Sequence, residues 1–407
     1  MVLIECFTEA HIENIAACLR LKPEKMILMG EASAMGAPVK RYREILEGRN
    51  ISTEIILKDI HGKDIADICD LFKSLLEAEE DYVIDLTGGD EQVFMAVGAA
   101  LAGMDSEKRA RVRVEQYSPE ADAILDVGND NRPVPCKPIS LSVAELLRLH
   151  GALLHPDTAT GETNKERKKV EKLWALVAKS PKAWNQNIAI LKEFEGRADS
   201  KMQVFLHRNQ WSYIPNHEEK VERLRDFLGE LDRIGIISDE SGQNKLEYAY
   251  ESPFLRQYLD KAGNLLELKT LLEGRAVMEN GVPFFQDCRM SVGIDWDGYV
   301  PEEPSNEPET RNEIDVILIH GVTPLFISCK NGNVPDEELY KLNTVANRFG
   351  GPYARKMLIA TELSQKGGVK ANDFLIQRAK DMGIHLVENA AKLSEEEWRD
   401  TLKNAVK

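Results

Sequence analysis

The stretch NEIDVILIHGVTPLFISCKNG, residues 312–332, consists of two apolar segments joined by a short turn that contains a glycine. Short apolar runs bounded by turn residues are typical of buried strands, so we predict two neighbouring strands here. Asp315 lies inside the first strand, and Lys330 ends the second, two residues after Ser328. Charged side chains rarely occupy such positions unless they are paired or bind a metal. The acid and the lysine therefore form either a buried cross-strand ion pair or part of a catalytic site.

The residues around this pair of strands have the pattern of an α/β domain. A helical segment that contains GNLLELKTLLEG comes first, and CRMSVGIDWDG predicts a strand that ends in a turn. A helix in DEELYKLNTVANRFGG, a strand in ARKMLIATEL and a last helix and strand follow the pair. Strands flanked by helices in this way predict an α/β domain with a mixed sheet over residues 252–407.

The first part of the chain alternates short apolar strands with helices. The predicted strands are VLIECF, KMILMG, STEIILKDI, YVIDLTGG and RVRVEQY, and a helical segment follows each of the first four. Repeated βα units predict a parallel, doubly wound, Rossmann-like sheet over residues 1–140, with its ligand site at the carboxyl ends of the strands. The next segment, VGNDNRPVPCKPISLS, is rich in Pro and Asn, and we place the domain boundary soon after this loop.

Residues 141–251 have mainly helical patterns and end in a hydrophilic hairpin, SDESGQNKLEYAY. A helix followed by such a hairpin is compatible with a winged helix. We favour a connector with a structural role for this segment, because no strongly basic recognition helix stands out.

Length, net charge and cysteine content limit the classes of protein to which this chain can belong. A chain of 407 residues is too long for one ordinary core, so two or three domains are expected. The net charge of −16 predicts weak non-specific binding to DNA, yet a cleft that handles phosphates can be locally basic, so a nuclease is not excluded. No apolar run is long enough to cross a membrane, and no signal peptide is recognisable. The six cysteines are scattered without CxxC pairs, which favours reduced thiols in the cytoplasm over a zinc or disulfide framework.

Three loops at the predicted ligand edge have residues that suit a phosphate. Thr87, Gly88, Gly89 and Asp90 stand between a strand and a helix, where glycines let backbone N–H groups approach an anion at a helix N-terminus. The alternative is a plain turn in which Asp90 caps the helix. The other two loops contribute small or polar residues, namely Thr8 and Glu9 after the first strand and Gly30, Ala32 and Ser33 after the second. Neither a dinucleotide fingerprint nor a P-loop is present.

The acid and the lysine of the opening stretch suit metal-dependent cleavage of a phosphodiester. Such cleavage needs oxygen ligands for Mg²⁺ or Mn²⁺ and a cation near the attacking water or the phosphate. Asp315 can bind the metal, Lys330 can stabilise developing charge, and Glu267 on the preceding helix can supply a further ligand. The alternative for Glu267 is a surface ion pair with Lys269 or Lys261. The three residues together favour catalysis.

This ordered set of motifs resembles the PD-(D/E)xK nuclease superfamily. More closely, GNLLE, GIDWDG, RNEIDV and FISCKNG resemble the DUF1887 family, in which a CARF domain precedes a restriction-endonuclease-like domain. The TGG turn resembles the ligand loop of CARF sensors. The resemblance covers most of the chain and is greatest for the Card1/Can2 type of CRISPR ancillary nuclease.

The resemblance implies a role for each of these residues. Glu267, Asp315 and Lys330 would be catalytic, with Glu267 and Asp315 as metal ligands, and the TGG turn would hold a cyclic oligoadenylate. Many relatives have an acid at the position of Ser328, so the metal here would rely on the two carboxylates, water and the carbonyl of Cys329. Many CARF loops carry a lysine after the glycines, where this chain has Asp90 and Glu91.

The resemblance implies a homodimeric, metal-dependent endonuclease that cyclic tetra-adenylate activates in type III CRISPR antiviral defence. The substrate would be DNA, RNA or both. Two alternatives are a ligand-sensing DNA-binding regulator and an enzyme that degrades the cyclic nucleotide, each with an inactive nuclease domain. Glu9 and His11 are the only candidate acid–base groups near Thr87 for the second alternative.

Overall fold

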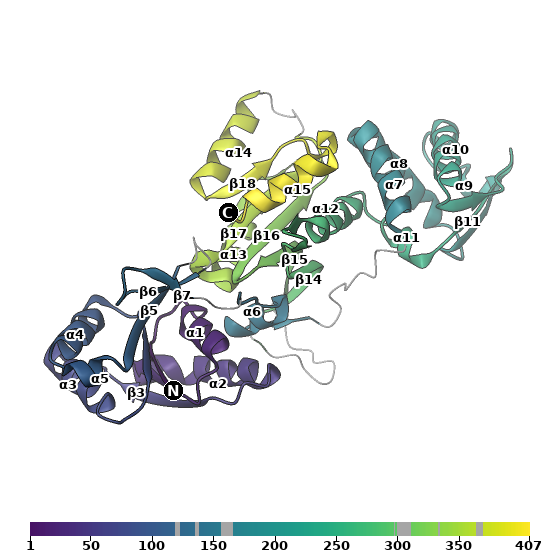
Figure 1. The fold of residues 1–407 in the computed structure, drawn as a ribbon. Coiled ribbons are helices and arrows are strands. Elements are labelled where there is room, and N and C mark those ends of the chain that lie inside the picture. Colours follow the sequence, from purple (N-terminus) through teal and green to yellow (C-terminus); the bar gives the residue numbers. More distant parts are fainter. Residues whose placement is uncertain are drawn as a thin grey trace.

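A computed structural model describes residues 1–118, 123–134, 138–155, 166–296, 298, 311–332, 334–363 and 369–407. Two α/β units lie next to each other, and a third, smaller unit lies beside the second, at the far end from the first (Figure 1). The N-terminal unit is purple to blue, and the C-terminal unit is green to yellow. The chain therefore has the α/β architecture that its sequence predicts.

The N-terminal unit contains a seven-stranded sheet in the order β3-β2-β1-β4-β5-β6-β7. Its first five strands run parallel, and they are β1 (Val2–Cys6), β2 (Lys25–Gly30), β3 (Glu54–Asp59), β4 (Tyr82–Asp85) and β5 (Val112–Ser118). The strand order reverses between β1 and β4, which is where doubly wound sheets bind ligands. The predicted parallel sheet is confirmed.

Helices cover both faces of this sheet. They are α1 (Glu13–Leu21), α2 (Ala32–Gly48), α3 (Ile65–Leu75) and α4 (Glu91–Ala102), with the short α5 (Ser106–Arg109). Strands β1 and β4 are buried along their whole length, as expected for parallel strands between two layers of helices. The loop predicted at residues 127–142 is only partly a loop, because β6 (Ala123–Asp126) pairs with β7 (Arg132–Val134) in antiparallel fashion. Residues 135–137 of that segment lie outside the described residues.

The C-terminal unit contains a six-stranded sheet in the order β18-β17-β16-β15-β14-β8. Neighbours from β8 to β16 run antiparallel, and those from β16 to β18 run parallel. The strands are β8 (Leu153–Leu154), β14 (Asp287–Asp295), β15 (Arg311–His320), β16 (Thr323–Lys330), β17 (Arg355–Ala360) and β18 (Ile384–Val387). The two strands predicted from the opening stretch are β15 and β16.

The remaining elements of this unit surround the sheet. They are α6 (Val143–Leu149), α11 (Pro253–Gln257), α12 (Asn264–Ala276), β12 (Met278–Glu279), β13 (Val282–Pro283), α13 (Glu337–Gly350), η2 (Gly351–Tyr353), α14 (Val369–Asp381), η3 (Ala390–Lys392) and α15 (Glu395–Asn404). Because β8 pairs with β14, Leu153 and Leu154 belong to this sheet, although they lie within the connector that we predicted from residue 141 onward.

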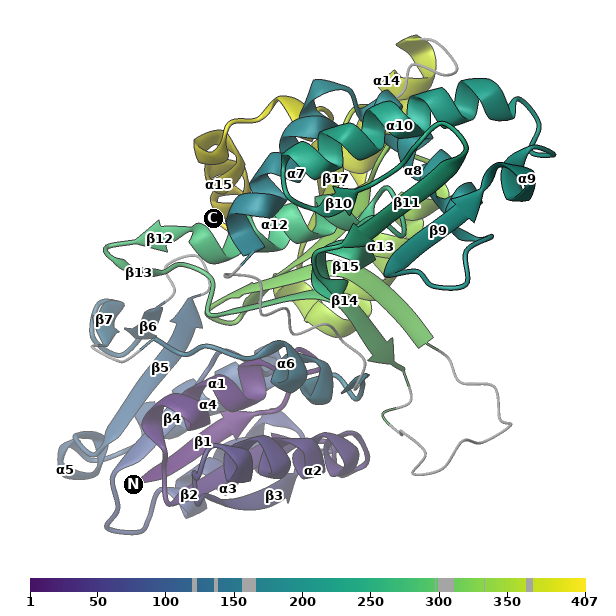
Figure 2. The same cartoon turned by 90° about the vertical axis from the view of Figure 1, so that its right-hand side faces the viewer.

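The third unit has winged-helix topology. Its elements are α7 (Arg167–Lys179), α8 (Pro181–Glu195), β9 (Gln203–His207), α9 (Arg208–Trp211), α10 (His217–Arg233), β10 (Ile237–Asp239) and β11 (Lys245–Tyr250). The strands form an antiparallel sheet in the order β10-β11-β9 (Figure 2). Helix α10, which precedes the hairpin, carries more acidic than basic side chains, so it does not resemble a helix that enters a DNA groove.

Two large apolar cores meet on the second sheet. Val316 and Leu318 of β15 pack in one core with α12, α15 and the winged helix. Ile317 and Ile319 pack in the other core, which continues through α13 and α6 into α1 and α2 of the N-terminal unit. The N-terminal sheet and the second sheet therefore share a continuous apolar core.

Two predictions from composition are also tested here. No helix among the described ranges is long and apolar enough to cross a membrane. The five cysteines within the described ranges are buried and free.

Candidate functional site

Asp315 lies where the pairing of β15 with both of its neighbours is interrupted. The register of β14 and β15 pairs Met290 with Val316 and Val292 with Ile314, which leaves Ser291 and Asp315 unpaired between them. Ser291 has a φ of 48°, in the left-handed region that non-glycine residues rarely adopt. The pairing of β15 with β16 likewise begins only beyond Asp315, at Val316. The strands open at this point, and the carboxylate of Asp315 lies in the opening.

Three consecutive residues of β16 contact the Asp315 carboxylate. The backbone N–H of Cys329 donates to Oδ2 at 2.6 Å, and the Ser328 hydroxyl donates to the same oxygen at 3.2 Å. The Nζ of Lys330 lies 3.7 Å from it. The Ser328 hydroxyl therefore helps to fix the carboxylate of Asp315.

Glu267 approaches the same opening from the first turn of α12. The Ser291 hydroxyl donates to its Oε2 at 3.3 Å. Burial, and then the charges of Asp315 and Glu313, raise the pKa of Glu267 to about 8. The surface pair that we considered between Glu267 and Lys269 is not formed, because Lys269 pairs with Glu273 at 2.7 Å. Two carboxylates that disfavour each other's charge create a place where a cation is stabilised.

Lys330 has a second acidic partner on α13. Its Nζ lies 2.9 Å from Oε2 of Glu338. Burial alone would lower the pKa of Lys330, but Asp315 and Glu338 outweigh it and raise this pKa, so the ammonium stays charged. The side chains of Lys330 and Asp315 are 24% and 19% exposed, so this pair is open to solvent and differs from a fully buried cross-strand ion pair.

The donor set at this opening is suited to a hard cation. In the described part of the chain, no three His, Cys, Asp or Glu side chains cluster in a way that could hold a metal ion. A metal here would therefore combine the carboxylates of Asp315 and Glu267 with backbone or hydroxyl oxygens, which is the chemistry of Mg²⁺ or Mn²⁺.

Cys329 can contribute to such a site only through its carbonyl. Its N–H points toward Asp315, and in a strand the carbonyl of a residue points to the same side as its N–H. The thiol lies 3.6 Å from the Thr270 hydroxyl of α12, and burial raises the pKa of Cys329 well above its usual range. The sulfur is therefore a protonated core group.

Sequence reasoning missed two residues of this site. Ser291 gave no signal, because a local break in strand pairing leaves no periodic pattern. Glu338 could have been found as an acid in the first turn of the helix that follows Lys330. Asp297, in the GIDWDG motif, lies outside the described residues.

The predicted ligand loops of the first sheet come together at one edge. Strands β1, β2 and β4 are adjacent and parallel, so the residues that follow them meet there. A Cβ on Gly88 would lie 2.5 Å from the carbonyl oxygen of Cys6 and 2.8 Å from Cγ2 of Thr8. Gly89 has a φ of +103°. Only glycines fit this turn, which brings its backbone against the loop after β1.

Several side chains of these loops already have partners. The Thr87 hydroxyl donates to Asp85 and accepts from the N–H of Tyr117, so it has no donor left for a phosphate in this conformation. Asp90 accepts from the N–H of Val93 and caps α4, as the simpler alternative predicted.

The other predicted ligand residues lie around this edge. The N–H of Ala32 donates to Asp59, and Ser33 donates to Glu31. Glu9, Ala32 and Ser33 are exposed, whereas Gly30 is buried and its position would place a Cβ 2.6 Å from that of Phe7. The backbone and the exposed side chains are thus what this edge offers to a ligand.

Comparison with known proteins finds similarity both in the C-terminal part and in the whole fold. Residues 265–405 match the family model described as Card1-like, endonuclease domain. The fold of the whole chain is similar to that of protein VC1899 from Vibrio cholerae, with 18% identity, a TM-score of 0.72 and coverage of 100% of this chain and 97% of that one. It is also similar to Can2 from Sulfobacillus thermosulfidooxidans in complex with cyclic tetra-adenylate, with 17% identity, a TM-score of 0.66 and the same coverage. No curated protein matches the sequence.

These comparisons show the fold of the chain and the similarity of its C-terminal part to one family model. Glu267, Asp315 and Lys330 all lie within the residues that match the Card1-like endonuclease domain model. The chain as a whole has the fold of the Card1/Can2 type of CARF nuclease, and the resemblance that we inferred from sequence is confirmed at that level.

Proposed function

We propose that this protein is a metal-dependent endonuclease that a cyclic oligoadenylate activates in type III CRISPR antiviral defence. The observation that carries the proposal is the meeting of Glu267, Asp315 and Lys330 at the opening between β14, β15 and β16, inside a Card1-like endonuclease domain. The substrate is the phosphodiester backbone of DNA, RNA or both, and the enzyme acts in the cytoplasm. Buried free thiols accord with a reducing compartment.

In this mechanism each charged group has a separate role. Asp315 and Glu267 would hold Mg²⁺ or Mn²⁺ with the carbonyl of Cys329, and the ion would supply Lewis acidity and an activated water. Lys330 stabilises the negative charge that develops on the phosphate oxygens. Ser328 and the N–H of Cys329 keep the Asp315 carboxylate oriented, since both donate to one of its oxygens. We propose the other oxygen of this carboxylate as the metal ligand.

We propose cyclic tetra-adenylate as the activator and the edge formed by the loops after β1, β2 and β4 as its site. Can2, which shares the fold, was solved in complex with this ligand. The close approach of the glycines to the loop after β1 lets backbone groups line the edge. A ring ligand with internal symmetry fits a two-fold axis, so we propose a homodimer in which both copies supply the same loops.

The two alternative functions gain less support. A DNA-binding regulator would need a basic helix in the winged-helix unit, whereas α10 is acidic. An enzyme that degrades the ring would need an acid–base group near Thr87. Burial, and then the charges of His150 and Arg41, lower the pKa of His11 to about 4, and its Nδ1 lies 3.0 Å from the Tyr42 hydroxyl.

The direct test is cleavage with defined cofactors and ligand. Supercoiled plasmid and a labelled single-stranded RNA are each incubated with the protein and Mn²⁺, with and without cyclic tetra-adenylate. We expect rapid nicking of at least one substrate only when the metal and the ligand are both present. EDTA should abolish the activity. A protein that cleaves neither substrate with Mn²⁺ and any cyclic oligoadenylate would contradict the proposal.

A further inference from the structure

Two consecutive residues in the first turn of α1 form hydrogen bonds with different parts of the molecule. Glu13 accepts a hydrogen bond of 2.5 Å from the hydroxyl of Tyr353, in η2 directly after α13. Asn14 is buried and holds the backbone of Thr8 from both sides, accepting from its N–H at 2.8 Å and donating to its carbonyl at 2.7 Å. One helical turn therefore contacts both the predicted ligand loop and the endonuclease domain.

The surroundings of this turn are closely packed. The Asn14 amide also donates to the Tyr42 hydroxyl at 3.0 Å, and the His11 ring lies 5.7 Å from the ring of His150 on the C-terminal side of α6. The apolar core that contains Ile15 of α1 continues without a break to α13. Close-packed interiors transmit displacements, so a shift of the first turn of α1 will be felt at α13.

The opposite end of α13 lies at the catalytic lysine. Glu338, in the first turn, is 2.9 Å from the Nζ of Lys330. Helix α13 has 14 residues and therefore spans about 21 Å. It contains no proline, and its only glycine is its last residue, so it behaves as one rigid element between the two contacts.

We infer that α13 couples the predicted ligand loop to the catalytic lysine, with Tyr353 as the contact at the sensor end and Glu338 as the residue that positions Lys330. The inference rests on the proposed nuclease function and assigns the route of its regulation.

The geometry at Lys330 gives this coupling a chemical consequence. An ammonium group has three donors, and here Glu338 and Asp315 face two of them, which leaves one for a phosphate oxygen. Glu338 is the closer partner, so it determines where the ammonium lies relative to Asp315. A displacement of α13 moves Glu338, and Lys330 follows.

The sensor end is tested by removing one hydroxyl. Tyr353→Phe deletes the hydrogen bond to Glu13 and keeps the ring. We expect the ratio of cleavage with cyclic tetra-adenylate to cleavage without it to fall at least about fivefold, because coupling between sites typically contributes this much or more. Cleavage without ligand should not change. Tyr340→Phe is the matched control, since Tyr340 lies on the same helix, is 51% exposed and should keep the full response.

A double-mutant cycle separates this contact from a general loss of packing. Glu13→Ala should reduce the response as Tyr353→Phe does, and the double variant should lose no more than either single variant. Additive losses would show that the two residues act independently, and the route through their contact would be overturned.

The catalytic end is tested at Glu338. Glu338→Gln keeps an acceptor but not the charge, and Glu338→Ala keeps neither. We expect cleavage to slow about tenfold or more in the first and further in the second, both with and without the ligand. Urea unfolding should show unchanged stability, since a positioning residue affects the rate and not the fold. Full activity of Glu338→Ala would overturn the positioning role.

Hydrogen exchange gives a readout that does not depend on cleavage. Cyclic tetra-adenylate should change the exchange of amides in the first turn of α13 in the parent protein but not in Tyr353→Phe. If the ligand changes this exchange and no cleavage follows, the nuclease function fails while the coupling stands. If Tyr353→Phe responds as fully as the parent in both cleavage and exchange, the coupling is wrong.

Discussion

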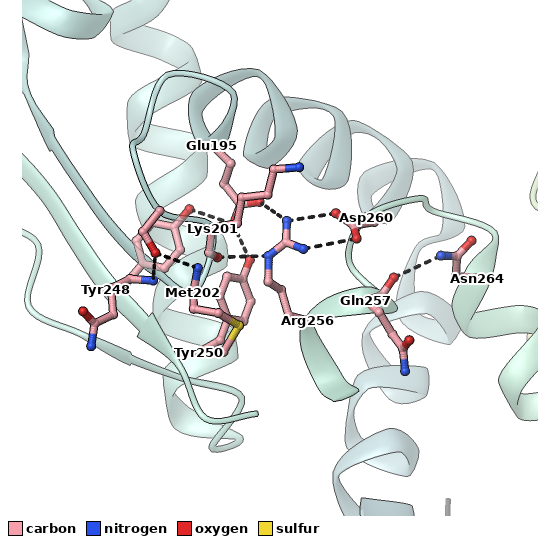
Figure 3. Close-up of polar contacts among 11 residues, drawn as sticks. Glu195, Lys201, Met202, Tyr248, Tyr250, Arg256, Gln257, Asp260 and Asn264 are labelled. Carbon is pink, nitrogen blue, oxygen red and sulfur yellow. Dashed lines mark hydrogen bonds and ion pairs between the residues drawn. The ribbon is translucent and has the colours of Figure 1, made fainter. Parts of the chain in front are cut away.

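Two glutamates, the buried Glu195 of the winged-helix unit and the partly buried Glu267 of the endonuclease domain, have opposite surroundings. Glu195 ends α8, where the hydroxyls of Tyr250 and Tyr248 donate to it at 2.5 and 3.2 Å and Arg256 lies 3.3 Å away (Figure 3). Glu267, in the first turn of α12, accepts from the Ser291 hydroxyl alone among the hydrogen bonds found in the described ranges, while Asp315 repels it.

The difference in surroundings distinguishes a carboxylate with a structural role from one with a functional role. Every strong donor around Glu195 comes from a neighbouring element of the fold, and Arg256 is in turn fixed by Asp260 at 2.9 Å. A carboxylate that is satisfied in this way holds elements together. A partly buried carboxylate that faces another acid and only one hydroxyl destabilises the free protein, and it is retained where a cation or substrate completes its surroundings.

The largest expected effect comes from removing the aspartate that belongs to the surroundings of each glutamate. Asp315→Ala should lower the rate of cleavage at least about a thousandfold, because the proposed metal loses its central ligand. Asp260→Ala removes an aspartate of the Glu195 network and should leave the rate per folded molecule unchanged. Single-turnover cleavage of plasmid with Mn²⁺ and cyclic tetra-adenylate measures both variants. Equal losses in the two variants would remove the distinction between the regions.

Removing Lys330 should affect mainly the rate of cleavage, whereas removing Arg256 should affect mainly the stability of the fold. Lys330→Ala should slow cleavage about a hundredfold, as the loss of one preorganised electrostatic group does, without lowering the free energy of unfolding. Arg256→Ala leaves Glu195 buried without its cation and should lower that free energy by about 3 kcal/mol. Urea unfolding and cleavage rates on both variants check this. An unstable Lys330→Ala protein would mean that Lys330 has a structural role.

The smallest expected effect is on the gain in stability that metal binding gives, which is measured without any cleavage. At ten times its dissociation constant, Mn²⁺ should stabilise the parent protein by about 1.4 kcal/mol. Glu267→Gln should lose most of this gain, because an amide is a weaker metal ligand than a carboxylate, whereas Glu195→Gln should keep it. Thermal unfolding with Mn²⁺ and with EDTA provides the measurement. A gain that survives in Glu267→Gln would place the metal elsewhere.

The sequence was most informative where a pattern repeats. The βα alternation predicted the first sheet, and two apolar runs predicted β15 and β16, because burial imposes periodicity on whole elements. Asp315 and Lys330 were visible as charges that interrupt such runs. Glu338 and Ser291 were not, since their importance arises from helix packing and a break in pairing that join distant segments.

Very short elements were also beyond the reach of sequence patterns. Two residues form β8, which is too short for any alternation to be recognised. The partners of the Thr87 hydroxyl could not be predicted for a related reason, because Asp85 and Tyr117 lie on two different strands that only the folded sheet brings together.

The placement of β8 means that the endonuclease domain is interrupted in the sequence by the winged helix. Leu153 and Leu154 pair with the end of β14, and the N–H of Val143 donates to Asp287 at its beginning. A fragment that starts at residue 252 would therefore expose β14 as an open sheet edge, which invites aggregation. During synthesis, α6 and β8 leave the ribosome long before their partner strand. The first segment of the endonuclease domain is therefore synthesised directly after the N-terminal unit, before the inserted winged helix is complete.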